Sequence, residues 1–342
     1  MGTMSHLSSS THVPLSILDL VSVSTNQSVG EAIGASMRAV QVADSVGYRR
    51  VWFAEHHNTS AVASSSTAVL VGQAAARTSR IIVGSGGVML PNHAPLMVAE
   101  DYGTLAAMYP GRVELGLGRA PGTDMATARA LARSDASPNA FVANVTDLHD
   151  WMDTGVASSG LRAGVAAGSR VPMWILGSST AGAQIAAHLG LPYSFASHFA
   201  PDALMAALEV YRSRFNPDAP TAQISEPHVM VGVNVLACDD DAEAHHQFTT
   251  VQRMFLSLRR TGGRDALLPP GDIEATSDEL AMMEHMLQVS AIGSPARVTS
   301  QLESLVDMTG ADELITVTYA HDPDVRIRSL ELVAQSWGLG VG

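Results

Sequence analysis

The chain has 342 residues, 46% of them hydrophobic, so it is long enough for two average domains or for one large α/β barrel. The net charge of −13 argues against nucleic acid or an anionic membrane as a partner. All 20 basic residues are arginine, which excludes a Schiff-base or Walker A lysine, and the single cysteine, Cys238, excludes a disulfide framework.

Residues 1–12 are mostly small and polar, and they lack the apolar core of a secretion signal. No run of about 18 apolar residues occurs further along the chain, so no membrane span is expected. We therefore expect a disordered leader over residues 1–12, one domain over residues 13–342 and a cytoplasmic location.

Short apolar runs alternate with helical patterns along this domain. Strands are expected at 14–23, 48–54, 80–90, 112–118, 171–177, 191–197, 228–237 and 312–320. Helices are expected at 30–47, 64–79, 93–111, near 138–155, at 179–190 and 201–215, and in a closing segment that ends near Trp337. Residues 120–170 read as largely irregular, and residues 241–309 read as a long region of helices and loops.

This alternation demands a parallel sheet, and eight units suit a closed (β/α)₈ TIM barrel with insertions after the fourth and seventh strands. A doubly wound open sheet is the alternative. Its dinucleotide-binding form would place GxGxxG after the first strand, and no such motif follows residues 14–23.

Polar side chains follow the second strand directly, as Glu55, His56 and His57. The carboxyl ends of barrel strands form the active-site face, so these residues are expected at the mouth of the barrel. Ordinary hydrogen-bonded surface histidine is one alternative. A metal site is another, but neighbouring residues on a strand point to opposite sides and do not converge easily on one ion. We expect no metal.

Glycines interrupt the third strand at Gly84, Gly86 and Gly87. Glycine weakens a strand, so the three indicate a bulge or a close approach of the backbone to a flat ligand. A simple kink without any ligand is the alternative.

A basic residue, Arg119, follows the fourth strand, and Gly177, Ser178 and Ser179 open the helix after the fifth strand. A guanidinium is a planar anion clamp, and the free N–H groups of a helix start favour phosphate. An ordinary N-cap is the alternative for the serines. Together, the two adjacent strand exits predict a phosphate site. Two further histidines, His198 and His321, follow the sixth and eighth strands. Either can line the pocket, but a satisfied surface histidine is the favoured interpretation for both.

Three segments carry a family resemblance, in the order GYRRVWFAEHHN, RIIVGSGGVMLPNHAPLMVAEDYGTLAAMYPGRVELGLGRAPG and WILGSSTAGAQIAAHLGLP, and the later ELITVTYAHDP fits as well. Together they resemble the bacterial luciferase-like flavin monooxygenases, and most closely the actinomycete enzymes that tailor aromatic polyketides. The resemblance covers the first six strands and is weak at 120–170 and 240–280.

The resemblance implies a barrel that uses reduced FMN, delivered by a separate reductase, together with O₂. It implies that His56 lies beside the flavin as the catalytic residue, and that Glu55 and His57 orient His56 or its loop at the cofactor site. It places a non-prolyl cis peptide at Gly86–Gly87 under the flavin ring. The family's phosphate ligands correspond to Arg119, Gly177, Ser178 and Ser179.

The function that follows is a two-component FMN-dependent monooxygenase acting on an apolar, aromatic polyketide-type substrate. One departure is Gly118, where luciferase has a reactive cysteine, and this speaks against light emission. An F420-dependent hydride-transfer oxidoreductase is one alternative. A non-catalytic flavin-binding subunit is the other, although the intact EHH motif opposes it. The resemblance also implies a homodimer formed through the second and third helices.

Overall fold

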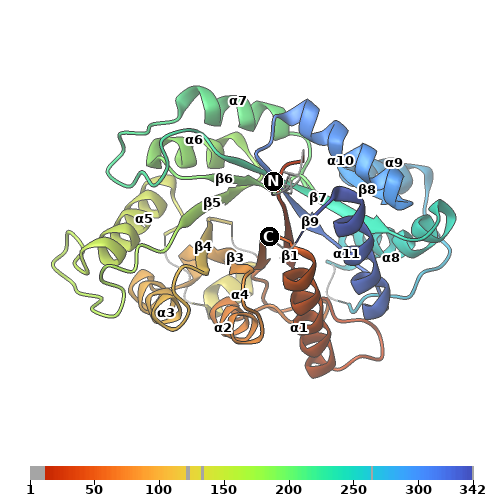
Figure 1. The fold of residues 1–342 in the computed structure, drawn as a ribbon, viewed down its shortest axis with the longest axis horizontal. Helices are drawn as coiled ribbons and strands as arrows, with labels where there is room; N and C mark the ends of the chain where they lie inside the picture. The colour runs from red at the N-terminus through yellow and green to blue at the C-terminus, as the bar shows by residue number, and fades with distance from the viewer. Residues whose placement is uncertain (1–11, 121–123, 132–134, 263–264, 341–342) are drawn as a thin grey trace, which may run out of the picture.

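The computed structural model describes residues 12–120, 124–131, 135–262 and 265–340. These residues form one parallel sheet that closes on itself, with helices around its outside (Figure 1). The strands are β1 (Leu15–Asp19), β2 (Arg50–Phe53), β3 (Ile82–Met89), β4 (Val113–Gly118), β5 (Met173–Gly177), β6 (Tyr193–Phe195), β7 (Val229–Ala237), β8 (Ser290–Gly293) and β9 (Glu313–Val317).

Helices follow most of the strands. They are α1 (Val29–Val46), α2 (Thr67–Arg77), the 3₁₀ helix η1 (Leu90–Asn92), α3 (Pro95–Met108), α4 (Met125–Ala130), α5 (Pro138–Asp153), α6 (Thr180–Leu189), α7 (Leu204–Arg214), α8 (Asp241–Thr261), α9 (Ser277–Met286), α10 (Pro295–Thr309) and α11 (Pro323–Trp337).

The barrel is a ring of eight strands, β1 to β7 and β9. β1 pairs with β9, and β7 pairs with both β9 and β6, so the ring has no open edge. The predicted (β/α)₈ barrel is confirmed, and the open doubly wound sheet is excluded.

The prediction for residues 241–309 was incomplete, because this region contains the strand β8 as well as helices. β8 pairs with the outer half of β7, from Asn234 to Ala237, whereas β6 pairs with the inner half, from Val229 to Val231. The long strand β7 therefore extends beyond the short strand β6 at the mouth.

The first helix shows how local sequence sets an element's ends. Ser28 accepts the backbone N–H of Glu31, and the Glu31 carboxylate accepts the N–H of Ser28, which completes a capping box. At the other end, Gly47 adopts a left-handed conformation with φ of 97°, as predicted for a C-cap.

The core has two parts, because side chains alternate along each strand. Met230 and Leu236 of β7 belong to the cluster inside the barrel, together with Trp52 and Trp174. Val231 and its alternate neighbours on β7 belong to the cluster between the sheet and the helices. Alternate residues of β7 therefore face the barrel interior and the surrounding helices.

The two ends of the described chain meet at one face of the barrel. The ring of His12 stacks on that of Trp337 with centroids 4.0 Å apart, and Trp337 Nε1 donates to the Val13 carbonyl at 2.8 Å. Residues 1–11, which make up nearly all of the predicted leader, lie outside the described residues. Across the described ranges, none of the helices has the length and apolarity needed to cross a bilayer.

Candidate active site

The loop after β2 is built around one buried carboxylate. Glu55 has no exposed surface, and its oxygens lie 2.9 Å from Nε2 of His57 and 2.9 Å from Nε2 of His93. The backbone N–H of Met89 also donates to it at 3.0 Å. Glu55 thereby ties the exit of β2 to the end of β3, so it orients the loop.

The charges in this cluster follow from its geometry. Burial raises the pKa of Glu55, but the hydrogen bonds and charge of His93 outweigh that effect, and the pKa is lowered overall. The hydrogen bond that His93 donates to Glu55 raises the pKa of His93. His93 and Glu55 therefore form an ion pair. No role was predicted for His93, which follows the glycine-rich strand β3 and the short helix η1.

His56 lies in the same loop, and its backbone N–H donates to the Ser64 carbonyl at 3.1 Å. His198 follows β6, which lies opposite β2 in the ring, and the charge of His56 contributes to lowering the pKa of His198. The prediction that His198 is a satisfied surface residue was wrong, because only 6% of it is exposed. In contrast, His321 is satisfied, since Thr25 Oγ1 lies 3.0 Å from its Nε2.

The glycines of β3 create an irregular strand. The Gly86–Gly87 peptide bond is cis, as predicted, and the register with β4 shifts between Ser85 and Val88, which confirms the bulge. A Cβ on Gly86 would come within 2.6 Å of Leu18 Cδ1, and one on Gly87 within 2.8 Å of the Gly116 carbonyl oxygen. Neighbouring groups thus leave no room for side chains at this pair.

The predicted phosphate residues lie on neighbouring strands. Gly118 of β4 pairs with Leu176 of β5, so Arg119 lies next to Gly177 at the mouth. Ser179 is the N-cap of α6 but makes no capping hydrogen bond in the described part of the chain, and no acidic residue occupies the first turn. The Tyr193 hydroxyl donates to the Ser179 carbonyl at 3.2 Å, which fixes this turn. The helix start is therefore an uncapped donor of N–H groups beside an arginine.

Two further contacts join segments around the mouth. Asn58 Nδ2 donates to Asp124 Oδ2 at 2.9 Å, which links the loop after β2 to the segment after β4. The segment after α8 reaches the loop after β1, where Leu267 N donates to the Val23 carbonyl and Thr25 N donates to the Leu267 carbonyl, both at 2.8 Å. Both loops are thus anchored on the barrel rim.

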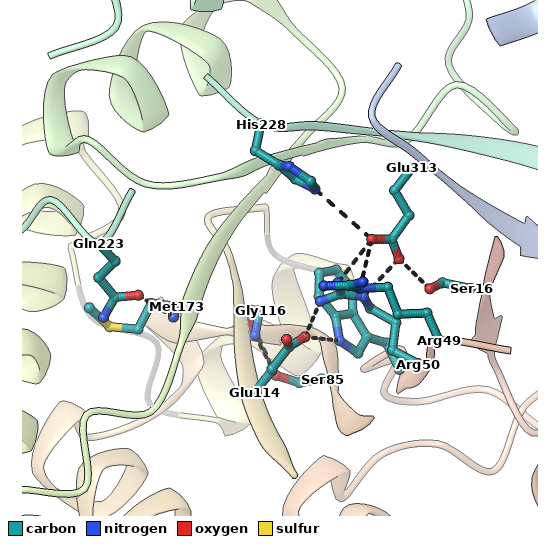
Figure 2. Close-up of polar contacts among 11 residues, drawn as sticks. Ser16, Arg49, Arg50, Ser85, Glu114, Gly116, Met173, Gln223, His228 and Glu313 are labelled. Carbon is teal, nitrogen blue, oxygen red and sulfur yellow. Dashed lines mark hydrogen bonds and ion pairs between the residues drawn. The ribbon is translucent and has the colours of Figure 1, made fainter. Parts of the chain in front are cut away.

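A separate polar network fills the opposite end of the barrel (Figure 2). Arg50, the first residue of β2, donates from Nε to Glu313 at 2.8 Å and from Nη1 to Glu114. Its guanidinium carbon lies 4.8 Å from the ring centroid of Trp174. Burial raises the pKa of Glu114 despite the charge of Arg50. This network plugs the end away from the mouth, so it stabilises the barrel and takes no part in the site.

Within the described ranges, no group of three or more His, Cys, Asp or Glu side chains is arranged to hold a metal ion. The mouth instead brings together imidazoles, an arginine, an uncapped helix start and an irregular glycine strand. An arginine beside the free N–H groups of a helix start suits the phosphate group of an organic ligand.

Comparison with known proteins agrees with this chemistry. The sequence profile of the luciferase-like monooxygenases matches residues 13–313. A luciferase-like monooxygenase of Escherichia coli (strain K12) is 42% identical over 325 residues, which cover 94% of this chain and 96% of the relative. The N-acetyl-S-alkylcysteine monooxygenase of Bacillus subtilis (strain 168) is 32% identical over 239 residues, which cover 68% of this chain and 71% of that protein.

A solved structure gives the same result in three dimensions. The crystal structure of apo-MsnO8 superimposes with a TM-score of 0.84 and 32% sequence identity, over 96% of this chain and 99% of that one. The matches span the barrel from its first strand to its last. The chain therefore belongs to the luciferase-like monooxygenase family and is a flavin-dependent monooxygenase.

Proposed function

We propose that the protein is the oxygenating component of a two-component monooxygenase, which receives reduced FMN from a separate NAD(P)H-dependent reductase. The observation that carries this proposal is the position of Arg119 beside the uncapped start of α6, on the same mouth as His56. A phosphate there gains a charged donor and free N–H groups at once.

In this proposal, the residues at the mouth bind FMN at both its phosphate and its ring. Arg119, Gly177, Ser178 and Ser179 hold the phosphate, and the Gly86–Gly87 segment supports the ring. Bound in reduced form, FMN supplies the two electrons with which O₂ gives one oxygen atom to the substrate and one to water. Glu55 belongs to this site as the group that fixes the loop carrying His56.

His56 serves as the proton donor or acceptor of the reaction. Imidazole titrates near neutral pH, so it can transfer protons under physiological conditions. The buried strand β2 and the anchored loop after it hold His56 in place.

For the substrate, we propose an apolar, aromatic molecule of polyketide type, because the motifs resemble those of polyketide-tailoring enzymes. The similarity to N-acetyl-S-alkylcysteine monooxygenase supports a second class, a small thioether. Turnover of aromatic polyketide intermediates and of N-acetyl-S-alkylcysteines by the same reductase-coupled preparation decides between them.

We also propose a homodimer that forms through α2 and α3. Val69 of α2 is 67% exposed, and Met97 and Met108 of α3 are 62% and 60% exposed. Burying large apolar side chains of this kind stabilises association. Sedimentation of the wild type and of Val69→Asp tests the proposal, since the variant is expected to be monomeric.

Calorimetric titration with FMN and with F420 tests the cofactor. We expect FMN to bind more tightly than F420. The ring of F420 also lacks the O₂ chemistry of a flavin, so it would not support oxygenation. Tighter binding of F420, with reduction of a substrate in place of oxygenation, would establish the hydride-transfer alternative.

A further inference from the structure

The chain after β6 turns into the barrel and is fixed there by three hydrogen bonds. Ala196 N donates to the Gly177 carbonyl at 2.9 Å, and Ser197 Oγ donates to the Gly232 carbonyl at 2.5 Å. Asn234 Nδ2 donates to the carbonyl of His198 at 2.7 Å. The backbone that carries His198 is therefore anchored to both neighbouring strands, β5 and β7.

The ring of His198 occupies the place of a missing side chain. A Cβ built on Gly232 would come within 2.5 Å of His198 Nδ1, so a side chain at position 232 and the ring exclude each other. Gly232 lies between Met230 and Asn234 on the same face of β7, and Met230 packs inside the barrel with Trp52. The imidazole thus lies in the barrel interior.

The surroundings of this ring are chemically unusual. His198 Nδ1 and Asn234 Oδ1 are both buried, and neither has a hydrogen-bond partner among the residues that the structure describes. Burial, followed by the charge of His56, lowers the pKa of His198 to about 4. The ring is therefore neutral above about pH 5. Buried polar groups without partners are rare in folded proteins and concentrate at functional sites.

We propose that His198 is a second imidazole of the active site and that it hydrogen-bonds to the ligand bound at the mouth that also carries His56. β2 and β6 lie opposite each other in the ring, so the two histidines reach the ligand from opposite sides. The inference rests on the proposed function in taking that ligand to be FMN or the oxygenated substrate.

This arrangement divides two tasks between two identical side chains. His56 carries the exchangeable proton, whereas a neutral imidazole both donates and accepts hydrogen bonds without adding charge. His198 therefore suits a carbonyl or hydroxyl group of the ligand. Among the described residues, His56 is the titratable group whose charge acts on it.

The first test needs no cofactor. Nitrogen-15 NMR of the free protein follows the ring of His198 as the pH is lowered, in the wild type and in His56→Gln. We expect His198 to stay neutral until about pH 4 in the wild type and to titrate at higher pH in the variant, which lacks the neighbouring charge. Titration near pH 6.5 in the wild type, or an unchanged midpoint in His56→Gln, would overturn the inference.

The second test separates ligand contact from a packing role. His198→Gln keeps a neutral hydrogen-bonding group, whereas His198→Leu fills the space without one. We expect His198→Leu to lower kcat/KM by roughly 10- to 100-fold, the loss of one or two hydrogen bonds, and His198→Gln to retain most activity. Equal values for both variants and the wild type, with unchanged circular dichroism, would assign His198 to packing.

A matched glycine pair controls for indirect effects. Gly232→Ala should act like His198→Leu because its Cβ displaces the ring, whereas Gly34→Ala, with no atom within 4 Å of its Cβ, should behave as the wild type. Should the protein bind F420 in place of FMN, the same variants are measured with F420. The proposed function would then fail while the role of His198 is still decided.

Discussion

His93 Nε2 lies 2.9 Å from both carboxylate oxygens of Glu55, so one imidazolium neutralises a carboxylate that has no exposed surface. The pair joins the loop that carries His56 to the segment after the glycine-rich strand. Any change in its charge is therefore expected to affect both the stability of the fold and the geometry of the mouth.

His93→Gln should lower the free energy of unfolding by about 1–3 kcal/mol, because it leaves a buried carboxylate without its cation. Glu55 has a lowered pKa, so its contribution is present above its ordinary pKa of 4.5 and is lost as the pH falls. His93 has a raised pKa, so its contribution is complete below 6.5 and is lost as the pH rises through the folded value.

The difference in urea stability between wild type and His93→Gln should therefore be greatest between pH 4.5 and 6.5 and should shrink at alkaline pH. His246→Gln, which changes an exposed histidine of α8, is the control. A difference that does not vary with pH would show that the ion pair adds no stability.

Arg119→Ala should weaken FMN binding by roughly 10- to 100-fold, because a charge-assisted hydrogen bond contributes about 1.5–3 kcal/mol. Riboflavin lacks the phosphate, so it should bind both proteins equally. Calorimetric titration measures both affinities. An unchanged FMN affinity in Arg119→Ala would show that Arg119 does not bind the phosphate.

His56→Ala should lower turnover by about 10²–10⁴, the usual range for the loss of a general acid or base. His57→Ala should be milder, since His57 bonds to Glu55 and supports the loop. The measurement is the ratio of hydrogen peroxide to oxygenated product, with flavin occupancy checked in both variants. Equal ratios in the wild type and His56→Ala would move the catalytic role to another residue.

Oxygen consumption should require FMN, NAD(P)H and an added reductase, and the purified protein should be nearly colourless because the flavin leaves after each turnover. Spectroscopy and an oxygen electrode check both points. A tightly bound yellow flavin that NADH reduces directly would contradict the two-component proposal.

Arg50→Met should destabilise the protein by about 3–5 kcal/mol at pH 7, since it leaves two buried carboxylates, those of Glu114 and Glu313, without their cation. Adding Glu114→Gln and Glu313→Gln to Arg50→Met should recover part of the loss. The difference in unfolding free energy between the wild type and Arg50→Met should become smaller toward pH 4, because the unpaired carboxylates of the variant take up protons there. Urea unfolding at the two pH values tests this, and a constant deficit would point to packing alone.

The barrel could be predicted from the sequence because its strands and helices alternate with clear periodicity. β8 was missed because Ser290–Gly293 has only two apolar residues, and it exists as a strand because the outer half of β7 pairs with it. That pairing joins residues more than 50 positions apart, which no local pattern reveals.

In the site, too, some features could be predicted from the sequence and others depend on distant residues. The cis peptide was predicted at Gly86–Gly87 from a resemblance, and the structure contains it. His198 could not be placed correctly, because its burial depends on the absence of a side chain at Gly232, 34 positions further along the chain. His93 stood within a motif, but its role becomes apparent only with Glu55 beside it.

The attachment of Leu267 to the loop after β1 has a practical meaning for protein engineering. Two backbone hydrogen bonds form this attachment, and the buried side chain of Leu267 packs beneath it. Further along, Thr276 fixes the start of α9 through its own capping box. Between these two fixed points, Thr249, Arg253 and Arg260 of α8 also bond to the segment. An exchange of this segment for that of another family member therefore has to include α8, as one cassette.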